Sequence, residues 1–292
     1  MARIKWDQMA EKFFEGGCNH GVCFTGYNTT TEKYEVGEAW NGISGFTDNP
    51  SGADEQASYA DNIKYISLRG AENYGGTIKC FWYPDNFRNC LGKKTVTTGV
   101  TVSQQGRETF GFAVSTLVGN DTMGTEAGET IHIVWNATTS PSSKDYSSLN
   151  ESPSPSELSF EFTANPVDVG TNYKPTCNME ICNVGMDATA LGHFEELKRI
   201  IYGADYVTGA DDSYFDLTVP STATAQPSGW ADDVTAGKYY TRAVSGSTVT
   251  YTVVASGTAW SSGTAYYSLK QATLPTPAAI IELFGGSVNG VG

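Results

Sequence analysis

Cysteine and histidine are the residues of this sequence best suited to bind a metal ion, and they cluster once, near its start. The segment CNHGVC holds Cys18, His20 and Cys23, and a tight turn at Gly21 would bring these three ligands together. The six cysteines, however, are spaced C-x4-C, C-x9-C and C-x4-C, whereas zinc ribbons use C-x2-C pairs. We therefore favour reduced thiols without a ligand, with Cys80 as a small core residue, and predict no metal centre and no cofactor.

Acid–base chemistry has few candidates in this chain. His132 alternates with Ile131 and Ile133, so we expect it on the solvated face of a strand in a structural role. Paired carboxylates could serve a glycoside hydrolase, and Glu157 with Glu161, or Glu195 with Glu196, are close in sequence. Solvated charges explain both pairs better. Because the common hydrolase and phosphate-binding motifs are missing, we predict no catalytic residues, with a carboxylate-based hydrolase as an alternative.

Composition and charge narrow the classes of protein further. The chain has 292 residues, of which 39% are hydrophobic and 17% charged, enough apolar material for a large core. It carries 18 lysines and arginines against 32 aspartates and glutamates, a net charge of −14. Proteins that hold DNA do so with clustered cations, so a conventional DNA-binding role is excluded. We also expect no signal peptide and no membrane span.

Period-two alternation predicts many short strands. The apolar positions of these strands are Ile63 and Tyr65; Ile78, Cys80 and Trp82; Val100 and Val102; Phe110, Phe112 and Val114; Ile131, Ile133 and Trp135; and Leu158, Phe160 and Phe162. Strands with one apolar face need a cover, and a second sheet supplies it. We predict a mainly β fold, a sandwich or barrel of two packed antiparallel sheets.

Helical spacing occurs at three places. A stripe of Trp6, Met9, Ala10 and Phe13 predicts a short N-terminal helix that ends at Gly16. The segment 187–203 predicts the one long helix, which flanks the sheets, with Asp187 as its N-cap and Gly203 in the left-handed C-terminal position. The segment AAIIELF near the end of the chain predicts a short closing helix.

The composition changes after Gly203, where serine, threonine, glycine, alanine and tyrosine dominate. We predict an inserted small β module over 204–273, and a main domain over 1–203 that is closed by 274–286. Six aromatic residues of the module could form a platform that stacks on sugars, or could pack across strands as a small core, which we favour. They are Trp230, Tyr239, Tyr240, Trp260, Tyr266 and Tyr267.

Long ordered stretches of the chain carry a family resemblance. They include WDQMAEKFFEGG at 6–17, the whole segment 40–87, and the segments 101–135, 141–153, 162–167, 196–203 and 274–284. Together they resemble the major tail (tail tube) proteins of long-tailed, non-contractile bacteriophages. The resemblance covers about residues 1–203 and 274–285, and leaves the module at 204–273 outside.

The resemblance implies a structural virion protein and not an enzyme. Six β-sandwich subunits would form a ring whose inner wall is a β-barrel, and stacked rings would form the tail tube. Implied partners are copies of itself, the tape-measure protein, the tail terminator and distal tail proteins, and double-stranded DNA in transit. The implied location is the virion tail, assembled in the host cytoplasm. The acidic charge agrees with this interpretation, since a negative bore repels DNA from its wall.

Three surfaces are candidates for roles in such a tube. The long acidic connection over 45–62 is too polar to pack on its own subunit, so we predict an arm that orders on docking to the next ring, with a merely solvated loop as the alternative. The candidate residues of this arm are Asp48, Asp54, Glu55, Tyr59 and Asp61. In the helix, Leu191, Phe194, Leu197 and Ile201 are expected to be buried. Its inter-subunit candidates are Glu195, Lys198 and Arg199.

For the lumen of the tube, we consider the polar strand face of Ser159, Glu161 and Thr163, or that of Thr101 and Ser103. The module at 204–273 is expected on the exterior of the tube, where an insertion does not block the channel. The remaining alternative, supported by the aromatic residues of this module, is a β-rich protein that binds glycans or cell surfaces.

Overall fold

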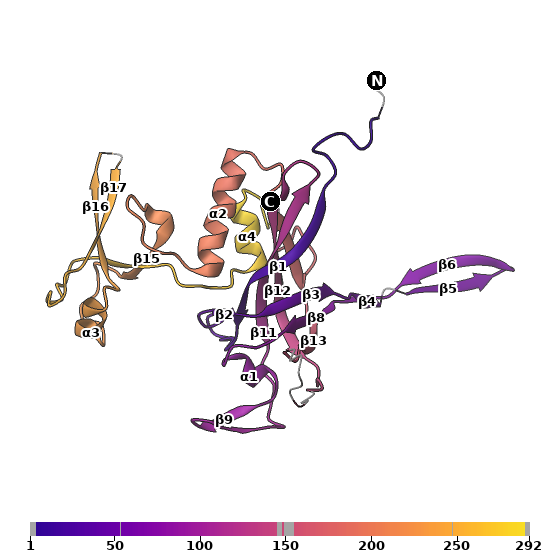
Figure 1. Ribbon diagram of the computed structural model, residues 1–292, viewed down its shortest axis with the longest axis horizontal. Helices are drawn as coiled ribbons and strands as arrows, with labels where there is room; N and C mark the ends of the chain where they lie inside the picture. Colours follow the sequence, from indigo (N-terminus) through magenta and orange to yellow (C-terminus); the bar gives the residue numbers. More distant parts are fainter. Residues whose placement is uncertain (1–3, 53, 145–147, 149–154, 247, 290–292) are drawn as a thin grey trace. The chain divides into compact units, whose positions relative to one another are not determined.

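The prediction of a mainly β fold is confirmed by a computed structural model (Figure 1), which describes residues 4–52, 54–144, 148, 155–246 and 248–289. Most of the segment 145–153, part of the resemblance, lies outside these residues. By its contacts the chain divides into two compact units, residues 1–194 with 274–292, and residues 195–273. Each unit is described by itself.

The larger unit is built on one antiparallel network of eight strands. Its order is β2 (Glu38–Trp40), β1 (Phe14–Phe24), β11 (Phe110–Asn120), β12 (Gly124–Thr139), β13 (Leu158–Ala164), β8 (Gly75–Cys80) and β3 (Ile43–Asp48), and β14 (Asn178–Cys182) also pairs with β12. The long β12 connects the two halves, because 130–134 pair with β14 and 137–139 pair with β13. The sandwich is therefore one continuous sheet that folds over its core, and not two separate sheets as predicted.

An aromatic core lies between the two halves of this folded sheet. Trp40 of β2 lies 4.5 Å from the ring centroid of Phe87 and 5.6 Å from that of Phe112, and Phe87 lies 5.5 Å from that of Phe160. Phe87 belongs to the short helix α1 (Phe87–Cys90). Strand β13 alternates strictly between buried and exposed residues, as its sequence predicts. Strand β11 differs, since most of its residues on both faces are buried.

The predicted N-terminal helix is wrong. Residues 4–13 have no helix, and Asp7 and Ala10 adopt positive φ values of 55° and 66°. The apolar stripe of Trp6, Met9 and Phe13 is exposed. A helix this short is stable only when tertiary contacts cover its apolar face, and these contacts are missing among the described residues.

Three two-stranded pairs extend the larger unit, and among the described residues none of them pairs with a further strand. They are β4 (Ser51–Gly52) with β7 (Glu72–Asn73), β5 (Glu55–Ala60) with β6 (Ile63–Arg69), and β9 (Lys94–Thr97) with β10 (Val100–Val102). The alternation over Ile63–Leu68 and Val100–Val102 predicts the strands, but the expected burial of one face is wrong, because these apolar side chains are exposed. Trp82 is likewise exposed, because β8 ends two residues before it.

The helix over 187–203 is confirmed as α2 (Ala188–Tyr202). The carboxylate of Asp187 accepts a hydrogen bond from the N–H of Ala190 at 2.9 Å, and Gly203 adopts a φ of 83°. Phe194, Leu197 and Ile201 are fully buried, but Leu191 is 40% exposed and its predicted burial is wrong. The closing helix is also confirmed as α4 (Pro277–Leu283), capped by Thr276.

The smaller unit contains a four-stranded antiparallel sheet in the order β15 (Phe215–Val219), β18 (Tyr266–Leu269), β16 (Tyr240–Ser245) and β17 (Thr248–Val253). The 3-10 helix η1 (Asp212–Tyr214) precedes it, and α3 (Trp230–Thr235) lies between β15 and β16 in the chain. Across both units, none of the helices in the described ranges is long and apolar enough to cross a membrane.

Candidate functional site

The β5–β6 hairpin is the longest of the strand pairs whose residues are all exposed in the described part of the chain. Every residue of both strands is exposed, including the large side chains of Tyr59, Ile63, Tyr65, Ile66 and Leu68, and Tyr59 is 72% exposed. Figure 1 shows the two strands as a separate ribbon, paired with each other alone. An isolated two-stranded hairpin with apolar side chains on its surface is marginally stable in water, so this element is suited to a partner.

A tight turn fixes the register of this hairpin. Ala60 pairs with Ile63, and the two residues between them, Asp61 and Asn62, have φ values of 50° and 66°. Positive φ at both central residues is characteristic of a type I′ turn, whose twist matches that of the paired strands. The connection expected over 45–62 as an unpaired loop is therefore largely β structure. The sequence did hold the signal, Asp-Asn between two alternating segments, which we missed.

The five arm candidates occupy different positions. Tyr59 and Glu55 lie on β5, where Glu55 forms an ion pair with Lys64 of the opposite strand. Asp54 is exposed just before β5, and Asp61 lies in the turn. Asp48 is separate from the hairpin, because it ends β3 and pairs with Gly76 of β8. The apolar residues of β6 were not among the arm candidates, although their side chains are exposed on the surface of the hairpin.

The lumen candidates share one polar surface. Ser159, Glu161 and Thr163 are the exposed positions of β13, while Leu158, Phe160 and Phe162 fill the core from its other side. Glu161 and Thr163 line a shallow hollow of about 200 Å³ together with Asn49, Ser51 and Thr77. Of the other candidate pair, Ser103 lies exposed after β10, and Thr101 within it is partly buried near Arg88.

The helix candidates make contacts within their own chain. Lys198 lies 3.7 Å from Glu195 as an i, i+3 ion pair. The guanidinium of Arg199 lies over the ring of Tyr214, 4.5 Å from its centroid, so its cation has an aromatic partner inside the smaller unit. Arg199 therefore has a partner within its own chain, and its role toward a neighbouring subunit stays a prediction.

The six aromatic candidates of the smaller unit form its cores. Trp230, Tyr239 and Tyr266 are buried in one cluster with Trp260 packed against it, and Tyr240 belongs to a second cluster against which Tyr267 packs. The indole N–H of Trp230 donates to the backbone oxygen of Thr258 at 2.9 Å. Trp230, Tyr239, Tyr240 and Tyr266 are buried in these clusters, which agrees with the favoured interpretation of a small core, whereas Trp260 and Tyr267 are partly buried.

The carboxylate pairs proposed for hydrolysis have other contacts. Glu157 accepts a hydrogen bond from the hydroxyl of Ser44 at 2.6 Å, Glu195 pairs with Lys198, and Glu196 lies 3.5 Å from Lys270. Glu161 projects from the exposed face of β13. Glu195 and Glu196 thus form ion pairs with lysines, and Glu157 is bound to a hydroxyl, so none of these contacts supports the hydrolase alternative.

The cysteines have the character of core residues. All six are free, and Cys23, Cys80 and Cys90 are fully buried. Burial raises the pKa of the Cys80 thiol to about 11 and that of Cys90 to about 12, so both remain protonated thiols at neutral pH. In the candidate metal set, His20 points to solvent, where it contacts Asn19, while Cys23 lies in the core, so strand β1 keeps them apart.

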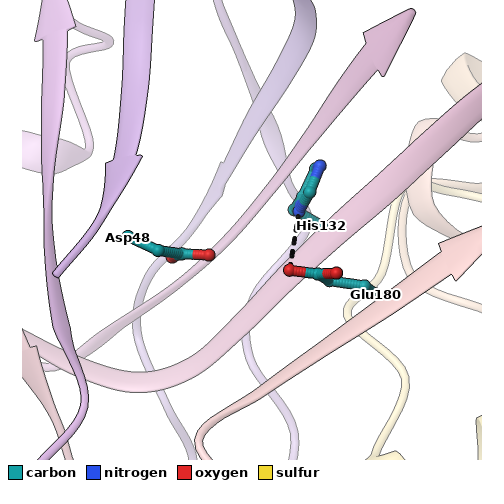
Figure 2. Close-up of side chains that lie close together, drawn as sticks. All are labelled: Asp48, His132 and Glu180. Atoms are coloured by element: carbon teal, nitrogen blue, oxygen red, sulfur yellow. Dashed lines mark ion pairs between the residues drawn. The ribbon is translucent and has the colours of Figure 1, made fainter. Parts of the chain in front are cut away.

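His132 departs from its expected position on a solvated face. Its side chain is only 12% exposed, and its Nε2 lies 3.0 Å from Glu15 and 2.9 Å from the hydroxyl of Thr116. Hydrogen bonding by Thr116, and less strongly by His132, lowers the pKa of Glu15. On the other side of the ring lie Asp48 and Glu180 (Figure 2). Neither Glu15 nor Glu180 was a candidate, because residues on separate strands carry no common sequence signal.

Comparison with known proteins leaves the family unassigned. No protein-family model matches the sequence, and no curated protein matches it.

Proposed function

We propose that this chain is a structural subunit of a tail tube of a long-tailed, non-contractile bacteriophage. Copies of the chain would form hexameric rings, and stacked rings would form a conduit for the genome that first contains the tape-measure protein. In this proposal the tail terminator and distal tail proteins contact the two ends of the tube. The subunit would be assembled in the host cytoplasm, reside in the virion tail, and have no enzymatic activity.

The observation that carries the proposal is the β5–β6 hairpin. Its strands have no other strand beside them, and it exposes Ile63, Tyr65, Ile66 and Leu68 to water. A long exposed hairpin with apolar side chains promotes association, and a protein selected to remain a monomer would cover or charge it. A partner that buries this hairpin is therefore expected, and a second copy of the chain is the simplest one.

Two further features support a ring around DNA. The net charge of −14 makes any ring of identical subunits strongly acidic, so a passing duplex is repelled from the wall. The exposed face of β13 is polar, with Ser159, Glu161 and Thr163 and no lysine or arginine in the strand to hold phosphates. This face remains our candidate for the lumen.

Negative-stain electron microscopy of the purified protein tests the proposal. We expect rings or cylinders about 100 Å wide, a width of the order expected for a closed circle of such domains. Analytical ultracentrifugation at increasing concentration is the matched measurement in solution. A protein that stays monomeric at high concentration would contradict self-assembly, and binding of glycans in an array would favour the alternative instead.

A further inference from the structure

Three strands bring a mixed set of metal-binding side chains to one place, shown in Figure 2. Asp48 ends β3, His132 lies in the middle of β12, and Glu180 lies on β14. His132 and Glu180 are directly opposite one another in the β12–β14 pairing. Each of the three residues offers one ligand atom, and these atoms all lie within 4.8 Å of one another.

The hydrogen bonds of His132 decide which of its nitrogens is free. Its Nε2 lies 3.0 Å from Oε1 of Glu15, and an ionised carboxylate only accepts hydrogen bonds. Nε2 therefore carries the proton, and in the neutral ring Nδ1 presents its lone pair. Nδ1 is buried and has no hydrogen bond, and its nearest partner is Oε1 of Glu180 at 3.5 Å. A histidine that donates one ring N–H to a carboxylate while the other nitrogen is free is the arrangement found at metal sites.

The negative charge around His132 also favours binding of a cation. Three carboxylates, those of Glu15, Asp48 and Glu180, surround one imidazole, and within the described residues none of the three forms an ion pair with a lysine or arginine. The hydroxyl of Tyr74 donates a hydrogen bond to Asp48, which orients that carboxylate without changing its charge. Protonation of His132 would offset one of the three charges, whereas a divalent cation would offset two.

The geometry points to a binding site for one divalent transition-metal cation of the zinc class, with Asp48, His132 Nδ1 and Glu180 as its ligands. Ligands about 2.1 Å from a tetrahedral ion lie about 3.4 Å from each other, close to the observed distance between Nδ1 and Glu180. Glu180 is exposed, so its side chain is able to rotate the remaining distance toward Asp48, whose carboxylate is held by Tyr74. The imidazole selects zinc-class ions over Mg²⁺ and Ca²⁺, which prefer oxygen ligands alone.

The site would link parts of the sheet that are distant in sequence. The bound ion would attach the end of β3 to β12 and β14, and the chain leaves Asp48 for β4 and then the β5–β6 hairpin. In this arrangement Glu15 is a positioning residue, because it holds the proton on Nε2. The inference does not depend on self-assembly, since binding is measurable on the subunit alone.

Titration of the chelator-treated protein with Co²⁺, a spectroscopic substitute for Zn²⁺, tests the site. We expect one Co²⁺ per chain, with visible d–d absorption and without the charge-transfer band that thiolate ligands produce. His132→Gln and Glu180→Gln should each weaken binding at least about tenfold, and Glu15→Gln about 10 to 100-fold. His20→Gln is the matched control, since it removes an exposed histidine beside Cys18 and should leave binding unchanged.

Circular dichroism without metal should give the same spectrum for all variants. Glu180 is exposed, so Glu180→Gln keeps the test valid even if His132→Gln does not fold. An absence of one-to-one binding in the native protein would overturn the site, as would a His132→Gln protein that folds and binds Co²⁺ equally tightly. A thiolate charge-transfer band, or loss of binding in His20→Gln, would assign the metal to Cys18, His20 and Cys23 instead. Excess Mg²⁺ should not compete with Co²⁺.

Discussion

At the scale of single residues, burial separates side chains that share one helical stripe. Leu191 and Leu197 both belong to the apolar side of α2, yet Leu191 is 40% exposed and Leu197 is fully buried. The stripe predicts which side of a helix is apolar, but the length of helix that is covered depends on what packs there. The two leucines therefore allow the same substitution to be compared in two environments.

We expect Leu197→Asp to prevent folding or to lower the free energy of unfolding by about 3 kcal/mol or more, because it buries an unpaired charge. Leu191→Asp should change it by about 0.5 kcal/mol or less. Urea denaturation of the two variants and the native protein measures these changes in the free energy of unfolding. Equal losses in both would mean that the exposure of Leu191 is wrong.

In the smaller unit, the carboxylate of Asp212 is hydrogen-bonded to Arg242 and Tyr251. It accepts two hydrogen bonds from Arg242, both at 2.8 Å, and one from the hydroxyl of Tyr251 at 2.7 Å. Bonding by Arg242, and then by Tyr251, lowers the pKa of Asp212 from its ordinary 3.8 to about 2. A carboxylate with a lowered pKa in the folded state stabilises that state above its unfolded pKa and loses this contribution as the pH falls.

The Asp212→Asn variant should therefore have a lower unfolding temperature than the native protein at neutral pH. The difference should shrink as the pH falls from about 4 to about 2, where Asp212 of the native protein takes up its proton. Calorimetry of both proteins at a series of pH values measures this difference in unfolding temperature. Asp216→Asn, at an exposed position of β15, is the matched control and should show a much smaller effect. A difference that stays constant down to the lowest pH would argue against this assignment.

At the scale of elements, the β5–β6 hairpin combines a well-formed turn with an exposed apolar surface. The turn at Asp61 and Asn62 and the ion pair between Glu55 and Lys64 hold the strands together. Neither strand buries a residue in the larger unit, so the hairpin contributes little to the core. Substitutions here should separate association from folding.

We expect Ile66→Ser combined with Leu68→Ser to leave the stability of the subunit nearly unchanged and to prevent the formation of rings or tubes. Loss of buried apolar area at an interface removes the main attraction between subunits, and loss of exposed area within a subunit costs little. Electron microscopy and urea denaturation give the two readouts. Leu217→Ser, at an exposed position of β15, is the control and should still assemble. Normal tubes from the double variant would show that the hairpin does not take part in the interface.

At the scale of the whole molecule, the two ends of the segment 204–273, which forms most of the smaller unit, lie close together. The N–H of Ala204 donates to the backbone oxygen of Lys270 at 2.9 Å, and the N–H of Thr273 donates to that of Ile200 at 2.8 Å. The entry and exit of the inserted segment therefore meet at the end of α2. Insertions whose ends meet are removed with little change to the parent fold.

Removal of residues 204–272, with Gly203 joined to Thr273, should leave a folded protein that still forms tubes. Electron microscopy and circular dichroism of the shortened chain test both parts. A folded but monomeric product would show that the smaller unit takes part in assembly, contrary to the proposal that it lies on the exterior. An Ala204→Gly protein, cloned and purified in parallel, controls for handling.

The sequence alone determined local features, such as the two faces of a strand and the two ends of a helix. The alternation of Leu158 to Thr163 predicted both faces of β13, and Asp187 with Gly203 predicted the two ends of α2. These features depend on neighbours a few residues apart, through the pleat of a strand and the capping of a helix. The composition of the chain likewise predicted a mainly β fold.

Tertiary structure decided which of the predicted faces are covered and which side chains meet. The same alternation describes β13, which is half buried, and β6, which is exposed on both faces, because period two shows that side chains alternate and not what lies opposite them. The meeting of Asp48, His132 and Glu180 has the same origin. These residues lie on strands far apart in sequence, and only the pairing of β12 with β14 and the folding of the sheet bring them within reach of one ion.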